Sequence, residues 1–385
     1  MTGADGSFSL RLETANRVSL EIIHPDYHEE LIAVPPGGGG GPLTVTLAPY
    51  IQQREEVVVT ALRYPEPSLN VPAATSVRSG EALSEGLAST LTDGVGSLPG
   101  VSALGSGGFS VVPVIRGLSR NRVLFLVDSA RVMSDRRTGP GASFVFPEDM
   151  DRVEVLRSPS SVFYGSDAVG GVFQVFLKEP DPRPGIHGRA QARYGTVNGE
   201  KGAGLSLSGR NKALGFHMSL QGVDAGDYRN SGGVVLLSHY AQWSLAAKLT
   251  HESEKRRVAL SFLGSRGLNI GKPALDSATR PTWYPREHQN LAQIHWRETG
   301  FAGGELTFTA FVNPNFLETR TDRIAEHKTR ESTSRTESTD FGMQLAFNRR
   351  AAGFLRVQAG LDIGGRAGAS AVNRDTHFDS QGRPS

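Results

Sequence analysis

The sequence contains no cysteine among its 385 residues, which excludes disulfides, thiolate metal ligands and cysteine nucleophiles. It has no run of 18 or more apolar residues, so no transmembrane helix is predicted. Its net charge is only +2, and such an even balance does not favour nucleic acid as a partner. The motifs of serine hydrolases, phosphate-binding loops and zinc hydrolases do not occur. We therefore expect a protein that is not an enzyme and that needs no metal and no cofactor.

Glycine is frequent instead, at 46 residues, and short apolar stretches alternate with polar turns. This composition favours strands and turns over helices, so we predict a mainly β protein. Strands of about ten residues with alternating polarity can cross a membrane without any long apolar run. The length of the chain predicts more than one folded unit.

Residues 148–180 carry the most specific pattern. A strand pattern around 153–155 and an apolar run at 172–177 flank Ser-Pro, Gly-Ser-Asp and Gly-Gly turn sequences. The order Asp-x-Val-Glu-Val, Arg-x-Pro-x-Ser, Tyr-Gly-x-x-Ala-x-Gly-Gly-Val resembles the plug domain of TonB-dependent outer-membrane receptors. Two predicted strands upstream of this stretch also resemble the family. Taken together, the residues that match the plug motif are Arg116, Gly117, Asp128, Glu154, Arg157, Pro159, Ser161, Tyr164, Gly165, Gly170 and Gly171.

The resemblance implies an α+β plug domain over 67–181. Apolar residues at 87, 91, 95 and 98 predict one helix from Gly80 to the Pro99-Gly100 stop. Strands are expected at 112–117 and 122–128. Ser129-Ala130-Arg131 then replaces the glycine-containing turn usual in the family, which leaves the turn after Asp128 open, because glycine tolerates positive φ more cheaply.

Charged residues of the plug suggest two roles. Arg116, Glu154 and Arg157 are expected inside, either in ion pairs with a surrounding barrel or in pairs that stabilise the plug itself. By family topology the loops 102–110 and 128–147 would face the ligand. Arginine suits carboxylate or phosphate groups, so the ligand-facing candidates are Arg131, Arg136 and Arg137, with a solvated loop as the alternative.

The resemblance also implies that residues 185–385 form the first strands, about nine, of a transmembrane antiparallel β-barrel. Short connections near 209–213, 251–256, 300–303 and 350–353 alternate with longer ones near 196–202, 225–237, 266–288 and 314–337, as in outer-membrane barrels. Nine strands cannot close the 22-stranded barrel of the family, so we expect a chain truncated at both ends. Five aromatic residues are candidates for a membrane girdle: Tyr194, Trp243, Trp283, Tyr284 and Trp296.

Residues 1–48 show strand patterns at 7–12, 18–23 and 43–47, which indicate a small β-sandwich. They resemble the later part of a carboxypeptidase-regulatory-like domain, a module that precedes the plug in some of these receptors. The first residues lack the basic start and apolar core of a signal peptide, so we expect the export signal to be missing. His24, Asp26 and His28 fit a polar turn better than a metal site, because Pro25 lies between them.

Residues 49–66 are expected to form a linker with one β-prone run. On its own the run could be an ordinary edge strand. Its position before the plug resembles the TonB box, which implies that it adds as a strand to the periplasmic domain of TonB. The residues of this box are Glu56, Val57, Val58, Val59, Thr60 and Ala61.

The resemblance implies an importer in the outer membrane of a Gram-negative bacterium, with the leader and plug on the periplasmic side. The ligand would be a ferric siderophore, vitamin, oligosaccharide or peptide, and TonB would supply the energy. The expected partners are TonB, outer-membrane lipid and the nutrient ligand, without nucleic acid. One alternative is a plug–barrel receptor that acts in adhesion or signalling without transport. Another is a secreted soluble β-protein, which the alternating loop lengths do not favour.

Overall fold

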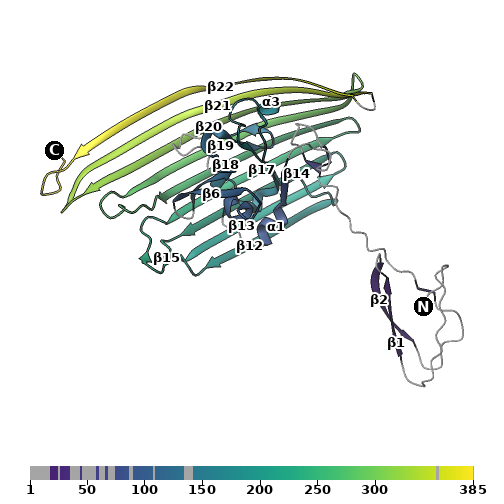
Figure 1. Ribbon diagram of the computed structural model, residues 1–385, viewed down its shortest axis with the longest axis horizontal. Coiled ribbons are helices and arrows are strands. Elements are labelled where there is room, and N and C mark those ends of the chain that lie inside the picture. Colours follow the sequence, from purple (N-terminus) through teal and green to yellow (C-terminus); the bar gives the residue numbers. More distant parts are fainter. Residues whose placement is uncertain are drawn as a thin grey trace. The chain divides into compact units, whose positions relative to one another are not determined.

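The computed structural model describes residues 18–24, 27–34, 44–45, 58–59, 66–67, 74–85, 90–106, 109–133, 142–352 and 355–384. The chain divides into two units, residues 1–57 and 58–385, which we describe separately. In the first unit β1 (Val18–His24) pairs antiparallel with β2 (Tyr27–Val34), as Figure 1 shows. The first of these strands was predicted and the second was not. The expected strand 7–12 lies outside the described residues.

The largest element of the second unit is a nine-stranded antiparallel sheet, which we call the wall (Figure 1). Its strands follow one another in chain order, and this confirms the nine strands expected from the alternating pattern. They are β12 (Gly185–Gly195), β13 (Glu200–Asn211), β14 (Leu214–Ala225), β17 (Tyr240–Glu252), β18 (Arg256–Gly271), β19 (Thr282–Phe301), β20 (Gly304–Ile324), β21 (Lys328–Ala352) and β22 (Leu355–His377).

The wall strands extend further than predicted at one end. A long loop was expected at 314–337, but β20 continues to Ile324 and β21 begins at Lys328. The sequence there is polar, and ion pairs between strands, such as Arg320 with Glu331, take the place of apolar contacts. Apolar alternation therefore predicted the middle of each strand and missed its polar extension.

The connections define two ends of the wall. We call the end with residues 196–199, 226–239, 272–281 and 325–327 the loop end, and the end with residues 212–213, 253–255 and 302–303 the turn end. One loop-end connection carries a small hairpin of β15 (Arg229–Asn230) and β16 (Gly233–Val234). Longer connections therefore lie mostly at one end, as predicted, although the connection at 325–327 is short.

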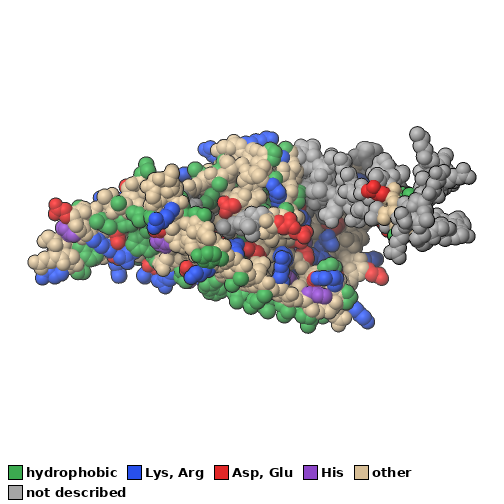
Figure 2. Space-filling view, turned by 90° about the horizontal axis from the view of Figure 1, so that it is seen from below, with side chains coloured by type: hydrophobic (Ala, Val, Ile, Leu, Met, Phe, Trp, Pro, Cys, Tyr) green, Lys and Arg blue, Asp and Glu red, His purple; other side chains and the backbone are tan. Residues whose placement is uncertain are grey.

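The two faces of the wall differ in polarity because successive residues of a strand point to opposite faces. Ser219 and Gln221 on β14 face the rest of the second unit, whereas Met218 and Leu220 between them are exposed on the outer face. Figure 2 shows hydrophobic side chains along the lower side of the molecule. An exposed apolar face over many strands is suited to lipid. Its members include Leu205, Leu207, Met218, Leu220, Leu249, Leu260, Phe262, Val312, Phe341, Met343, Leu345, Leu361 and Ile363.

The remaining part of the second unit, which we call the plug region, packs against the inner face of the wall (Figure 1). Its five-stranded sheet has the order β5 (Thr75–Ser79), β10 (Met150–Leu156), β11 (Gly171–Leu177), β8 (Val123–Val127), β9 (Ala130–Arg131). All pairs are antiparallel except β8 with β11. A hairpin of β6 (Val101–Ser106) and β7 (Ser110–Ile115) lies beside it, so most of the segment expected as a loop at 102–110 is strand.

Short helices complete the plug region: α1 (Gly80–Glu85), α2 (Leu91–Val95) and α3 (Ser161–Tyr164), with 3-10 turns at Arg120–Arg122, Ala142–Phe144 and Pro147–Asp149. The single helix predicted from Gly80 is wrong. Thr90 has extended backbone angles, and its side chain and that of Asp93 form a capping box that starts α2 as a new helix. The predicted apolar face is confirmed at Leu91 and Val95, which are both buried. Among the described residues, no helix is long and apolar enough to span a membrane.

Buried apolar side chains join the plug region to the wall. Phe125 and Phe173 lie at the centre of the plug sheet, and Ala246, Leu263 and Leu291 of the wall belong to the same cluster. Such burial excludes water from the interface and stabilises the docked plug region.

Gly171 marks a close backbone approach in the plug sheet. Its φ is +145°, and a Cβ there would lie 2.2 Å from the carbonyl oxygen of Leu156 on β10. We predict that Gly171→Ala destabilises the plug region by about 2–4 kcal/mol, measured by urea denaturation. Gly222→Ala is the matched control, since its Cβ would meet only an ordinary contact at 3.9 Å. Equal midpoints for both variants would contradict the steric argument.

Candidate functional site at the interface of plug region and wall

Buried charges hold the plug region to the wall at the turn end. Lys248 on β17 is 4% exposed, and its Nζ lies 2.9 Å from Asp128 Oδ2 and 3.1 Å from Glu179 Oε1. The same ammonium donates to the carbonyl oxygen of Leu177 at 2.9 Å. Arg257 on β18 also pairs with Glu179, which lies in the segment between plug region and wall. One lysine thus connects three separate parts of the plug region and its exit segment.

The turn that carries Asp128 is strained. Asp128 and Ser129 have φ values of +45° and +75°, which are uncommon for residues other than glycine. The turn nevertheless forms a tight connection between β8 and β9, and Asp128 accepts a hydrogen bond from the backbone N–H of Leu177 at 3.1 Å. Gln174 donates to the Ser129 hydroxyl at 3.3 Å. The turn after Asp128 therefore forms without glycine, because side-chain contacts stabilise its positive φ angles.

Asp149 lies in a cradle of wall side chains. It is 1% exposed, and Ser219 donates to its Oδ1 at 2.6 Å, Ser244 to its Oδ2 at 3.1 Å and Gln221 to its Oδ1 at 3.4 Å. Burial raises the pKa of Asp149 to about 6, and the hydroxyl hydrogen bonds offset part of that rise. The carboxyl therefore titrates just below neutral pH while it is bound to the wall.

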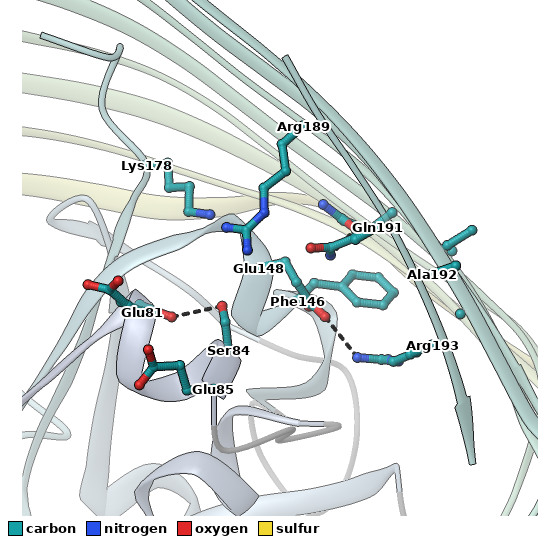
Figure 3. Close-up of a pocket in the computed structure, with 15 residues that line it drawn as sticks. Glu81, Ser84, Glu85, Phe146, Glu148, Lys178, Arg189, Gln191, Ala192 and Arg193 are labelled. Carbon is teal, nitrogen blue, oxygen red and sulfur yellow. Dashed lines mark hydrogen bonds and ion pairs between the residues drawn. The ribbon is translucent and has the colours of Figure 1, made fainter. Parts of the chain in front are cut away.

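A cavity of about 500 Å³ lies beside α1, between the plug region and strands β12 to β14 (Figure 3). Glu148 crosses one side of it to reach Arg193 on β12 at 2.8 Å, and Arg193 also pairs with Glu200 at 2.9 Å. Lys178 and Arg189 point into the cavity from another side, and burial lowers the pKa of Lys178. Acidic and basic side chains therefore both line this cavity.

Aromatic side chains close the interface at the loop end. Phe109, at the tip of the β6–β7 hairpin, lies 5.0 Å from the ring of Tyr240 between ring centroids. Phe146 and Tyr284 belong to the same buried cluster. Tyr284 was expected in a membrane girdle, but it lies within a register shift between Trp283 and Arg286 and faces inward, where it is 3% exposed. Trp243, by contrast, is 45% exposed on the outer face.

The plug-motif residues mostly build turns. Gly117 and Gly165 have positive φ, and a Cβ on Gly170 would lie 2.8 Å from Leu118 Cβ. Tyr164 is buried at the end of α3, which starts at Ser161, and its hydroxyl donates to Gln174 at 3.4 Å. Pro159 is exposed in the segment before α3.

The three charges expected inside have different surroundings. Glu154 is 3% exposed and pairs with Arg152 of the same strand at 3.0 Å. Arg157 is half-buried and donates to the carbonyl oxygen of Pro99. Arg116 is exposed, because it stands in a positive-φ turn after β7. Ion pairs between the plug region and the wall come instead from Asp128 and Glu148.

Of the ligand-facing candidates, only Arg131 is described. Its guanidinium pairs with Asp167 at 3.1 Å and donates to the carbonyl oxygen of Tyr164 at 2.8 Å, so it connects β9 to the α3 turn. Arg136 and Arg137 lie outside the described residues.

The expected TonB box is described only at Val58 and Val59, which form β3 and pair with β4 (Glu66–Pro67). Glu56, Val57, Thr60 and Ala61 lie outside the described residues, as does Asp26 of the weighed metal cluster. In the described part of the chain, no group of three or more histidine, aspartate or glutamate side chains could hold a metal ion.

Sequence reasoning missed Lys248, Asp149 and Glu179. Lys248 carried a usable signal: it is a lysine at an inward position of a strand that otherwise alternates apolar and small residues. Asp149 carried none, because its role depends on serines some 70 and 95 residues further along the chain.

We predict that Lys248→Met loosens the plug region, because the half-buried Asp128 loses its ion-pair partner, whereas the exposed Glu179 keeps Arg257. The loss should be about 1–3 kcal/mol. The measurement is the urea concentration at which trypsin releases the plug region from detergent-solubilised protein. Lys201→Met, at an exposed lysine, is the control. The same midpoint for both variants would exclude the anchoring role.

The pKa of Asp149 predicts a pH dependence of stability. Because the folded-state pKa lies above the ordinary value of 3.8, the folded protein binds the proton more readily than the unfolded chain. Stability contributed by this group should therefore fall as pH rises from about 4 to 6, by roughly 3 kcal/mol. Asp149→Asn should remove that slope and Asp151→Asn, at an exposed carboxylate, should keep it. Parallel pH profiles for wild type and Asp149→Asn would refute this.

Comparisons with known proteins agree with the plug resemblance. Residues 67–172 match the family model of the TonB-dependent receptor plug domain. The chain is 35% identical over 161 residues to a vitamin B12 transporter of Vibrio vulnificus, across 41% of this chain and 26% of that protein. It is 39% identical over 133 residues to an iron-regulated outer membrane virulence protein of Vibrio cholerae, across 32% of this chain and 20% of that protein.

Solved structures share the fold. The copper transporter OprC superposes with a TM-score of 0.66 at 18% identity, covering 80% of this chain and 48% of that chain. The siderophore receptor PiuA from Acinetobacter baumannii gives 0.61 at 18% identity, covering 85% and 49%. The chain thus spans about half of these structures and 20–26% of the curated relatives. The chain therefore contains a TonB-dependent receptor plug domain at residues 67–172, and it shares its fold with transporters and receptors of this kind.

Proposed function

We propose that the receptor to which this chain belongs imports a nutrient ligand with energy delivered by TonB. The observation that carries the proposal is the way the plug region is held: buried ion pairs and hydrogen bonds join it to the wall around Lys248 and Asp149. Buried ion pairs fix a geometry but add little net stability, so they can be exchanged for water when the plug region moves.

The chain order supports a pulling mechanism. The expected box at 56–61 precedes β5, which is an edge strand that pairs with β10 over five residues. A strand added to the box transmits force through backbone hydrogen bonds. That force reaches β5 and α1 first, whereas β8, β9 and β11 remain fixed through Lys248. The cavity beside α1 would widen when α1 leaves, and the ligand would pass there.

The relatives suggest the ligand class. They are named as a vitamin B12 transporter and an iron-regulated outer membrane protein, and one structural neighbour is a siderophore receptor. We infer a corrinoid or a ferric siderophore, bound at the loop end above the β6–β7 hairpin. In this proposal the loop end faces the cell exterior, and the turn end and the leader face the periplasm. Arg136 and Arg137 stay as ligand-contact candidates, and Arg131 positions the α3 turn.

Deletion of residues 55–61 in the full-length receptor should abolish uptake of radiolabelled cyanocobalamin or ferric siderophore by the source bacterium, while surface binding is kept. A sharper pair is Val58→Pro, which removes a backbone N–H, against Val58→Thr, which keeps it. Only the proline variant should lose uptake. Unchanged uptake in the deletion would contradict TonB coupling, and cell attachment without any uptake would favour the adhesion alternative.

A further inference from the structure

The outer face of the wall changes character near the loop end. One row of directly paired residues crosses five strands there: Trp243, Arg266, His288, Phe316 and Glu337. They face outward because their chain neighbours face inward. Gln242 donates to the carbonyl oxygen of Ser143, and Gln289 donates to that of Met133, both in the plug region.

A second outward row follows toward the loop end. Arg286 pairs with Glu318 at 2.8 Å, and Arg335 approaches the same carboxylate at 3.4 Å. In the described part of the chain Arg266 has no carboxylate partner; it donates to Asn290 at 2.8 Å and lies over the ring of Trp243. The two rows therefore hold three arginines against two glutamates, and the positive charge in excess lies at Arg266.

The rows border a hollow of about 370 Å³, lined by Arg286, His288, Phe316, Glu337 and Gly368 among others. The pairing of β21 with β22 shifts register between Glu337 and Thr339, two residues that line this hollow. Gly368 has a φ of +60°, and nothing lies within 4 Å of the position a Cβ would take. Arg286 and His288 both lie against the ring of Phe316, so the hollow has a cationic and aromatic side.

Apolar side chains begin directly on the turn-end side of these rows. On β18, Leu260 and Phe262 are exposed on the same face as Arg266, and on β20 Val312 is exposed on the same face as Phe316. A ligand that reaches both zones needs an anionic head and long apolar chains. Guanidinium groups bind phosphate with charge-assisted hydrogen bonds, and the apolar zone removes acyl chains from water.

We propose that Arg266, Arg286 and His288 form, with Phe316, a binding site for a phosphorylated lipid of the outer leaflet. Arg286, His288 and Phe316 line the hollow, and Arg266 lies beside it as the cross-strand partner of His288. The phosphate lies at this edge of the hollow, and the acyl chains lie along the exposed apolar side chains of β18 and β20. The excess charge selects an anionic head, and the aromatic rings suit the level where head groups meet acyl chains. A free phosphate would contact the cationic side alone. The choice of the outer leaflet rests on the proposed orientation of the loop end toward the cell exterior, whereas the site does not depend on import.

The test uses the full-length receptor, purified and placed in nanodiscs of phosphatidylcholine with or without phosphatidylglycerol as the probe. Native mass spectrometry counts retained phosphatidylglycerol. The double variant Arg266→Ala/Arg286→Ala should lose it roughly tenfold or more. Arg256→Ala is the matched control, because it lies on the same strand and face as Arg266, at the turn end, paired with Glu298. It should retain wild-type occupancy.

A lysine double variant and a competition with inorganic phosphate distinguish the remaining explanations. Arg266→Lys/Arg286→Lys preserves both charges and should retain most of the lipid, which separates lost charge from a damaged fold. Millimolar inorganic phosphate should not displace the lipid, because it lacks the acyl chains. Equal retention by the double alanine and Arg256→Ala variants would overturn the site. Displacement by inorganic phosphate would overturn the lipid and leave only an anion site.

Discussion

The ammonium group of Lys248 is the interaction on which the docked arrangement depends. It is buried between the wall and the plug region, and its three oxygen partners come from the β8–β9 turn, the end of β11 and the segment that leads into β12. A buried charge must be surrounded by partners, so its position fixes theirs. The register of the plug region against the wall is thus set by one side chain, and the apolar contacts of Phe125 and Leu263 add stability without setting direction.

The alternation of side chains along each strand suits the two faces of the wall to two different environments. Each strand alternates side chains between a lipid-facing and a plug-facing surface, so every strand contributes both to the apolar outer zone and to the polar inner lining. Ser219, Gln221 and Ser244 are short polar residues that fit this inner lining, and they bind Asp149 without carrying charge themselves. Along the outer face, charged side chains begin to replace apolar ones at the level of Arg266.

Periodicity predicted the fold well and the site poorly. The nine wall strands follow from alternation over a few residues, and the turns of the plug follow from local glycine and proline chemistry at positions such as Gly165 and Gly171. The helix after Gly80 was misjudged, because the capping box at Thr90 competes locally with an apolar pattern that continues through it. The partners of Asp149 and Asp128 could not be predicted, since they lie on wall strands far along the chain. Pairings of that kind are set by tertiary packing, which a single sequence does not encode locally.

The strained turn at Asp128 and Ser129 has a consequence for how the molecule is built. Backbone angles of this kind cost of order 1–3 kcal/mol and persist only when surrounding groups hold them. One of those groups, Lys248, belongs to a strand that is synthesised about 120 residues later. The plug region supplies the contacts of Leu177 and Gln174 with this turn by itself. The ion pair with Lys248 is added only when β17 is in place, so the last contact of the turn depends on the wall.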